Sequence, residues 1–180
     1  DPEWLVPTRE MYYAATNLSD RLCAARLVVH QGDEIHRAEV LEHFFDRWQT
    51  ENLVVNQWFV MQATRPSTDC VSDVIALTSH VAFDWRNPNK VRSLISAFAG
   101  ANPTAFHAFD GGGYRLLGDA VRRLQSDNPQ IAARMLAPMT RWRRYDHGQA
   151  VMHDELQSIA SLEGLSQDVY EVVNRSLQDS

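Results

Sequence analysis

The sequence has 180 residues, 44% of them hydrophobic and 22% charged, so we expect one compact unit that buries roughly 70% of its unfolded surface. Its 23 acidic and 17 basic residues give a formal net charge of −6, which argues against nucleic acid as a partner. Cys23 and Cys70 make no CxxC pair and are expected to be free thiols in a reducing compartment, which favours the cytoplasm. We expect neither a signal peptide nor a membrane span. The start at Asp1, without an initiator Met, is compatible with a piece of a longer polypeptide.

Apolar residues recur at helical spacing along nearly the whole chain, and short polar or Pro/Gly segments separate the runs. Residues 17–31 predict a helix that Asn17 caps and Gly32 ends. Asp33 caps the next predicted helix, over 33–51. Six apolar residues on one face mark it as a core helix: Ile35, Val40, Leu41, Phe44, Phe45 and Trp48.

Residues 53–65, LVVNQWFVMQATR, have the β-branched content of a buried strand. Val54, Trp58 and Met61 nevertheless share one face of a helix, so we predict a helix here. A further helix is predicted over 69–77.

An Asn-Pro pair occurs three times, at 87–88, 102–103 and 128–129, and Pro behind an Asn cap favours a helix start. The remaining predicted helices cover 110–125, 129–137, 138–145, 147–162 and 166–177. Helix pairs that recur roughly every 35 to 45 residues are typical of stacked antiparallel pairs rather than of a four-helix bundle. We therefore predict an all-α fold, an armadillo/HEAT-like α-superhelix in a single domain over 1–180.

Three glycines, Gly111, Gly112 and Gly113, follow Asp110 at the position where a phosphate-binding loop could lie. No strand is predicted before them, no Lys-Ser/Thr follows, and the glycine spacing of dinucleotide sites is missing. We interpret the cluster as a turn and helix cap.

Metal ligation has one candidate, the side of the second predicted helix that carries His36, Glu39 and His43. Arg37 and Arg47 lie close to that side, which favours a solvated polar face over a zinc site. The sequence therefore predicts neither a metal site nor a catalytic residue in this chain. His147 and His153 have no third partner and are expected at the surface.

Nucleophilic catalysis is not indicated, because no G-x-S-x-G elbow occurs and neither cysteine lies in the local context of a reactive thiol. The cluster RWRRY at 141–145 interleaves arginines with aromatics, a pattern that can stack on bases. In an acidic chain it more often marks intramolecular ion pairs and cation–π packing, which we favour.

Arg92, Gln130 and Arg134 occupy the first turns of two helices that begin at Asn-Pro pairs. Gln130 and Arg134 are four residues apart and share a helical face. Arginine suits carboxylate recognition because its planar guanidinium donates in bidentate fashion. From spacing alone we favour the alternative, that each arginine pairs with a neighbouring Asp or Glu.

Four stretches carry a resemblance to a known family: DRWQTENLVVNQWFVMQAT, NPNKVRSLISAFAGANPTAFHAFDGGGY, NPQIAARMLAPMTRWRRYD and LEGLSQDVYEVV. They resemble the C-terminal helical domain of bacterial aminopeptidase N, in order, over about 11–177. The sequence has DGGGY where the family commonly has DGSGY, a change that removes one hydroxyl from a turn.

The resemblance implies a cytoplasmic, multidomain zinc enzyme that removes N-terminal amino acids from peptides. The family's H-E-x-x-H and G-x-M-E-N motifs lie in a separate catalytic domain, and neither occurs in this sequence. The resemblance therefore implies a non-catalytic domain whose partners are the catalytic domain of the same polypeptide and peptide substrates. It also implies that this domain closes the active-site chamber, and that Arg92, Gln130 and Arg134 contact peptide on the primed side.

Two alternatives remain open at this point. A free-standing α-solenoid could serve as a protein-interaction scaffold, and it should carry polar caps at both ends, whereas a domain of a larger enzyme should expose an apolar patch. A nucleic-acid binder centred on Arg141–Arg144 would bind with steeply salt-dependent affinity.

Overall fold

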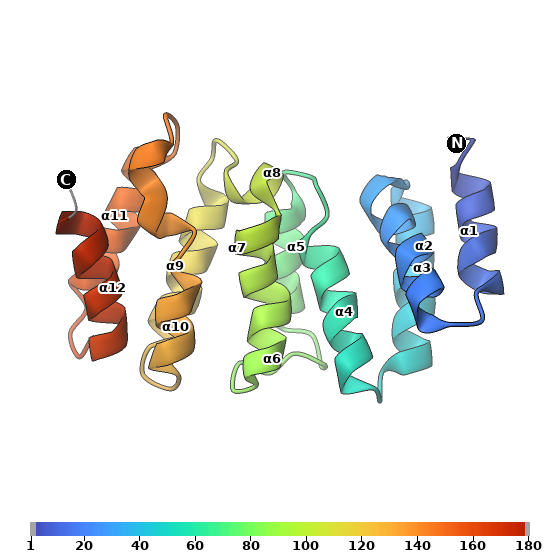
Figure 1. The fold of residues 1–180 in the computed structure, drawn as a ribbon, viewed down its shortest axis with the longest axis horizontal. Coiled ribbons are helices and arrows are strands. Elements are labelled where there is room, and N and C mark those ends of the chain that lie inside the picture. Colours follow the sequence, from blue (N-terminus) through green and yellow to red (C-terminus); the bar gives the residue numbers. More distant parts are fainter. Residues whose placement is uncertain (1–2, 179–180) are drawn as a thin grey trace.

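The computed structural model describes residues 3–178, and all regular secondary structure in that range is helical. The helices lie side by side along the longest axis, from α1 at one end to α12 at the other (Figure 1). In chain order the first half contains α1 (Leu5–Ala14), α2 (Leu18–Gln31), α3 (Glu34–Trp48), α4 (Asn52–Ala63) and α5 (Cys70–Leu77). The second half contains α6 (Pro88–Val91), η1 (Arg92–Ser96), α7 (Ala97–Ala101), α8 (Pro103–Phe106), α9 (Gly112–Leu124), α10 (Pro129–Met135), η2 (Met139–Arg144), α11 (Gln149–Ala160) and α12 (Gln167–Gln178).

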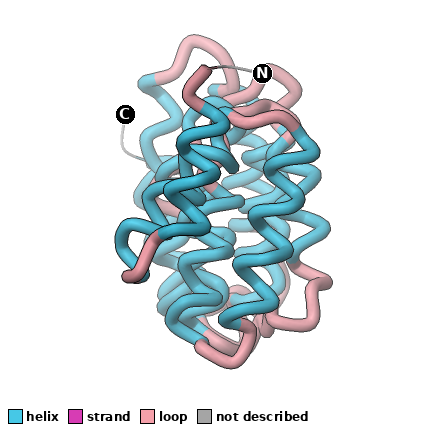
Figure 2. Tube along the Cα trace, turned by 90° about the vertical axis from the view of Figure 1, so that its right-hand side faces the viewer, coloured by secondary structure: helices cyan, strands magenta, loops and turns pink. Residues whose placement is uncertain are grey.

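From α4 onward the helices form two layers, and the chain alternates between them. One layer, which we call the front layer, holds α4, α6 to α7, α10 and α12, and the back layer holds α5, α9 and α11 (Figure 1). Contacts run along the back layer from α5 to α9 and from α9 to α11, and across the layers within the pairs α4/α5, α9/α10 and α11/α12. The loops gather at the two ends of the helices (Figure 2). This arrangement confirms the predicted α-superhelix of antiparallel helix pairs.

Side-chain caps start five helices where the sequence predicted them. Asn17 accepts from the Asp20 N–H and Asp33 from the His36 N–H. At the three Asn-Pro pairs the Asn side chain accepts a backbone N–H two or three residues later, at 3.0, 3.3 and 3.2 Å for Asn87, Asn128 and Asn102. These bonds satisfy N–H groups that the first helical turn leaves unpaired.

Three predicted details differ from the structure. The second predicted helix ends at Trp48, and its Ile35 is 79% exposed because no described helix covers that side of the first turn of α3. Gly32 ends α2 as predicted, but with a negative φ of −76°, so its role does not depend on a left-handed conformation. The segment 138–145 forms the 3₁₀ helix η2 rather than an α-helix.

The helices α6, η1 and α7 follow one another without a break, and we call residues 88–101 the π-interrupted helix because η1 is a π-helical turn. A π turn holds more residues than an α turn, so it changes which side of the helix the following residues occupy. Ser93, Leu94 and Ile95 of this turn are buried.

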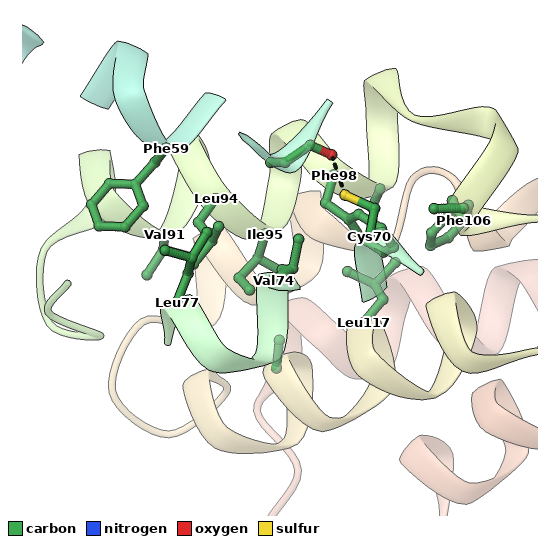
Figure 3. Close-up of a cluster of buried hydrophobic side chains, with 14 of the residues drawn as sticks. Phe59, Cys70, Val74, Leu77, Val91, Leu94, Ile95, Phe98, Phe106 and Leu117 are labelled. Atoms are coloured by element: carbon green, nitrogen blue, oxygen red, sulfur yellow. Dashed lines mark hydrogen bonds between the residues drawn. The ribbon is translucent and has the colours of Figure 1, made fainter. Parts of the chain in front are cut away.

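The core lies between the layers and draws on both. Phe59 of α4 and Val91, Leu94, Ile95 and Phe98 of the π-interrupted helix meet side chains of α5, α8 and α9 (Figure 3). Those side chains are Cys70, Val74, Leu77, Phe106 and Leu117. The thiol of Cys70 donates to backbone carbonyls of α4, and burial raises its pKa to about 11. Cys70 is therefore a protonated core residue.

A buried asparagine joins the end of α4 to the start of α8. The Asn102 amide donates to the carbonyls of Ala63 and Arg65 at 3.0 and 2.7 Å, and its carbonyl accepts the Ala105 N–H. The Arg65 guanidinium in turn donates to Asp69 and Asp73, each at 2.8 Å. This network holds the end of the π-interrupted helix beside the end of α4.

Candidate functional site

Two rows of accessible residues run along neighbouring helices of the front layer. On the π-interrupted helix, Asn89, Arg92 and Gly100 are exposed and Ser96 is half-buried, a spacing of three and four residues that places them on one side. We call these four residues the first stripe. The π turn keeps Gly100 on this side although it lies eight residues beyond Arg92.

The second stripe lies on α10 and η2. Its members Gln130, Arg134, Ala137 and Arg141 are all exposed and recur at intervals of four, three and four residues. Both helices begin at an Asn-Pro pair and lie in the same layer (Figure 1). The structure therefore places the predicted residues on two helices of one layer, with Arg92 at the start of η1, Gln130 in the first turn of α10 and Arg134 in its last turn.

The expected ion pairs of the two arginines are not what the described residues form. Arg92 donates through Nε to the carbonyl of Pro88 at 3.2 Å and through Nη2 to Asn89 Oδ1 at 2.8 Å, both within its own helix. Within residues 3–178, the side chains of Arg134 and Gln130 make no hydrogen bond or ion pair. Their polar groups face solvent and are available to a ligand.

An open cleft of about 430 Å³ lies at the opposite ends of the two stripes. Gly100 belongs to the first stripe and Ala137 and Arg141 to the second, and all three line it. His107 and Tyr145 complete its aromatic side. Arg141 was predicted to belong to a packing cluster, and this cleft was not predicted, because Arg134 and Arg141 lie on two different helices, α10 and η2.

Two of the candidate metal ligands of α3, Glu39 and His43, form hydrogen bonds with α1. The Glu39 carboxylate accepts from Arg9 at 2.5 Å and from the Tyr13 hydroxyl at 2.8 Å. His43 Nδ1 shares a 2.8 Å hydrogen bond with the hydroxyl of buried Tyr12, whose pKa burial raises. The predicted solvated face is therefore partly covered, because α1 bonds to Glu39 and His43, while Glu39 itself stays exposed. In the described part of the chain no group of three His, Cys, Asp or Glu side chains could hold a metal ion.

The RWRRY cluster is partly as predicted. Arg143 lies over the Trp142 ring at 4.0 Å, which confirms the cation–π packing. Instead of a carboxylate, Arg143 contacts the C-terminal end of α12, where it donates to the carbonyls of Ser176 and Leu177 at 2.6 and 3.0 Å. A cation there stabilises carbonyl groups that the helix leaves unpaired.

The glycine cluster is a turn, as predicted. Asp110 Oδ1 accepts the Gly112 N–H at 2.9 Å, and Gly111 adopts a left-handed φ of 69°. A Cβ on Gly113 would lie 2.5 Å from the carbonyl oxygen of Phe106, so only glycine lets α9 approach α8 this closely. These roles are structural, and they require no bound phosphate.

The two isolated histidines differ in exposure. His147 is exposed, as expected, and its Nε2–H donates to the His107 carbonyl at 3.0 Å. His153 is half-buried against the Trp142 ring. Cys23 and Cys70 are both free thiols, the first exposed and the second buried. Over the described residues, no helix is both long and apolar enough to cross a bilayer.

The fold defines the class of protein as an ARM-repeat α-superhelix. The chain belongs to the family of ARM-repeat domains described as "Domain of unknown function (DUF3458_C) ARM repeats", whose sequence model matches residues 1–178.

Among the relatives of this chain are bacterial aminopeptidases. The chain is 39% identical to Aminopeptidase N of Escherichia coli (strain K12) over 169 residues, which is 93% of the chain and 19% of that protein. It is also 39% identical, over 168 residues, to Aminopeptidase N of Haemophilus influenzae, again 93% of the chain and 19% of the relative. The chain thus spans about a fifth of the length of these curated relatives, and the matched part is their C-terminal region.

A solved structure supports the same relationship. The crystal structure of Legionella pneumophila aminopeptidase A in complex with aspartic acid superposes with a TM-score of 0.91 at 31% identity, over 98% of this chain and 21% of that one. The resemblance noted from the sequence is confirmed.

Proposed function

We propose that this chain is the non-catalytic C-terminal domain of a zinc aminopeptidase, which removes N-terminal amino acids from peptides. In this proposal the domain covers 1–180, packs against the catalytic domain of the same polypeptide in the cytoplasm, and helps to close the chamber around the active site. The observation that carries the proposal is the 39% identity over 93% of the chain to proteins named Aminopeptidase N that are about five times longer.

The zinc of this proposal lies outside the chain. Of the candidate ligands on α3, Glu39 bonds to Arg9 and Tyr13, His43 to Tyr12 and His36 to Asp33. The residues present therefore do not fit a catalytic metal, and the chemical step belongs to the rest of the polypeptide. What this chain contributes is enclosure and binding, which orient a peptide and exclude bulk water.

The proposed peptide contacts are Arg92, Gln130 and Arg134. Arg134 and Gln130 have no partner in the described chain, and the bonds of Arg92 to its own first turn can be exchanged for bonds to a ligand. Guanidinium groups would bind backbone carbonyls or a carboxylate beyond the scissile bond, on the primed side. Such contacts act on peptide binding and leave the chemical step nearly unchanged.

The alternative is a free-standing scaffold. Repeat proteins that are complete by themselves need polar outer faces on their terminal helices. The face of α1 and α2 does not meet this condition, because Met11 is 63% and Leu27 42% exposed. This apolar surface favours a domain that packs against the rest of a longer chain.

Kinetics of the full-length polypeptide test the proposal. We expect Arg134→Ala or Gln130→Ala to raise KM for tri- to pentapeptides, for arginine by roughly 5- to 150-fold if the lost contact is worth about 1–3 kcal/mol. The kcat for an aminoacyl anilide, which has no primed-side residues, should stay constant. Arg144→Ala, an exposed arginine outside both stripes, is the control. Unchanged KM values for long peptides in both variants would remove the assignment.

A further inference from the structure

The cleft at the far ends of the stripes has one charged group and walls of small residues. Of the residues that line it, Arg141 is the one with a permanent charge, and no carboxylate lines it. The walls come from the ends of α7 and α10, where Ala99, Gly100, Pro103, Ala137 and Pro138 leave room between the helices. Its volume of about 430 Å³ lies in the range of small-ligand pockets.

The three arginines of η2 differ in the contacts that their side chains make. Arg143 is held by Trp142 and the carbonyls at the end of α12. Arg141 and Arg144 are both exposed, and within residues 3–178 neither side chain makes a hydrogen bond, ion pair or cation–π contact. Only Arg141 lines the cleft, so Arg144 is a natural comparison with the same charge on the same helix.

The aromatic side of the cleft is rigid. The Tyr145 ring stacks on His107 with centroids 4.3 Å apart and an interplanar angle of 25°. His107 Nδ1 shares a 2.9 Å hydrogen bond with the hydroxyl of buried Tyr114. Burial, with the nearby His147, lowers the pKa of His107, so its imidazole is neutral at neutral pH. The charge that a ligand meets therefore comes from Arg141.

We infer that this cleft binds the C-terminal carboxylate of a peptide through Arg141, with the last side chain against the small-residue walls. A guanidinium beside an apolar hollow matches a carboxylate beside a side chain. That the ligand is a peptide rests on the proposed function, whereas the preference for a carboxylate rests on Arg141 and the walls alone.

The distance from the Arg92, Gln130 and Arg134 region to the cleft sets the length of peptide that can reach both. In the first stripe Arg92 and Gly100 are eight residues apart along the unbroken helix 88–101, which at about 1.5 Å per helical residue is roughly 12 Å. An extended peptide covers about 3.3–3.6 Å per residue, so about three residues separate the two contacts. The cleft favours substrates that extend this far beyond the Arg92, Gln130 and Arg134 region.

Binding to the 180-residue chain, which has its own core, tests the inference without any activity assay. The probes are acetyl-tetra-alanine with a free carboxylate and its C-terminal amide, titrated while backbone amide NMR signals of Gly100, Arg141 and Tyr145 are followed. We expect the acid to bind about tenfold more tightly than the amide, and Arg141→Ala to abolish that difference.

Two further pairs of variants separate the cleft from general charge and folding effects. Arg144→Ala should leave the preference for the acid intact. Gly100→Trp should fill the cleft without strain, since a Cβ there has nothing within 4 Å, while Ala101→Trp on the same helix but outside the cleft should have no effect. Circular dichroism checks that each variant is folded.

The outcomes are distinct. Equal binding of acid and amide, equal losses in Arg141→Ala and Arg144→Ala, or no binding at millimolar peptide each overturn the inference. If the acid preference depends on Arg141 while Gln130 and Arg134 variants of the full-length polypeptide keep their KM, the cleft stands and the proposed primed-side role fails.

Discussion

At the N-terminal end of the superhelix, α1 and α2 expose apolar side chains, whereas at the C-terminal end α12 exposes mainly polar ones. Met11 and Leu27 line two shallow hollows that share Cys23. On α12 the exposed residues are Gln167, Asp168, Tyr170, Glu171, Arg175 and Gln178, of which only Tyr170 is a large hydrophobic residue. The C-terminal end meets the solubility condition for a terminal repeat, and the N-terminal end does not.

The inner surfaces of the two ends are also different. α1 buries Leu5 and Tyr12 and is in addition attached to α3 by polar bonds, from Tyr12 to His43 and from Arg9 to Glu39. α12 is attached by an apolar underside that includes Val169 and Val173 and by the bonds from Arg143. At the N-terminal end, burial inside the fold and exposure at the surface therefore fall on different residues: Leu5 and Tyr12 are buried, whereas Met11 and Leu27 are exposed.

The largest effect is expected from Tyr12→Ala. Tyr12 is fully buried, so the change removes a core aromatic and leaves His43 without its partner, at a cost of about 3–5 kcal/mol in the free energy of unfolding. Urea denaturation measures it. The control Tyr13→Ala removes a ring that is 41% exposed and should cost clearly less. Equal losses would mean that α1 is not packed as described.

At the other end, Arg143→Ala should lower the free energy of unfolding by about 1–3 kcal/mol, because it removes two charged hydrogen bonds and a cation–π contact. Arg144→Ala should change it by no more than about 0.5 kcal/mol. The same denaturation assay checks both. If the two variants behaved alike, the contact of η2 with the end of α12 would contribute nothing to stability.

Acidification should weaken the N-terminal end through His30 of α2. Burial lowers the pKa of His30 in the folded state below the ordinary value of 6.5. As the pH drops through that value, the unfolded chain therefore binds more protons than the folded chain, and the free energy of unfolding decreases. His80 and His107 have pKa values lowered in the same direction by burial. We expect Tm to fall between pH 7.5 and 5.5, and His30→Gln to reduce that fall. A slope that His30→Gln leaves unchanged would contradict the assignment.

The smallest effect on stability is expected from Met11→Gln combined with Leu27→Gln, within about 0.5 kcal/mol, since both side chains are exposed. The same double variant should weaken association of this chain with the remainder of the full-length polypeptide, measured by calorimetric titration. Tyr170→Gln at the C-terminal end is the matched control and should not. Equal binding by all three proteins would show that the apolar surface is not an interface.

Much of the fold could be predicted because helix starts are local. Asn17, Asp33 and the three Asn-Pro pairs each place a cap within two or three residues of the N–H that it satisfies, so the sequence contains the whole interaction. The segment 53–65, ambiguous by composition, is helical because its apolar residues follow the helical period. The exact end of α3 and the 3₁₀ geometry of η2 were not predictable, because helix ends fray and short terminal turns are often 3₁₀.

The candidate site was predictable only in part. The four-residue spacing of Gln130 and Arg134 indicates a shared face, but the free state of Arg134 depends on which carboxylates the fold brings near it. The role of Arg143 at the end of α12 joins residues 33 and 34 positions apart, and the cleft beside Arg141 joins α7 to η2. No periodicity within one helix contains such information.

By itself the sequence determined the all-α class, most helix starts and the family, because capping, helical period and a resemblance over nearly the whole chain are properties of contiguous residues. The tertiary structure decided that Glu39 and His43 bond to α1, that the Arg141 side chain has no partner in the described chain while Arg143 has, and that Met11 and Leu27 lie exposed at the N-terminal end. These outcomes depend on contacts between helices distant in the chain, and such contacts exist only once the superhelix has formed.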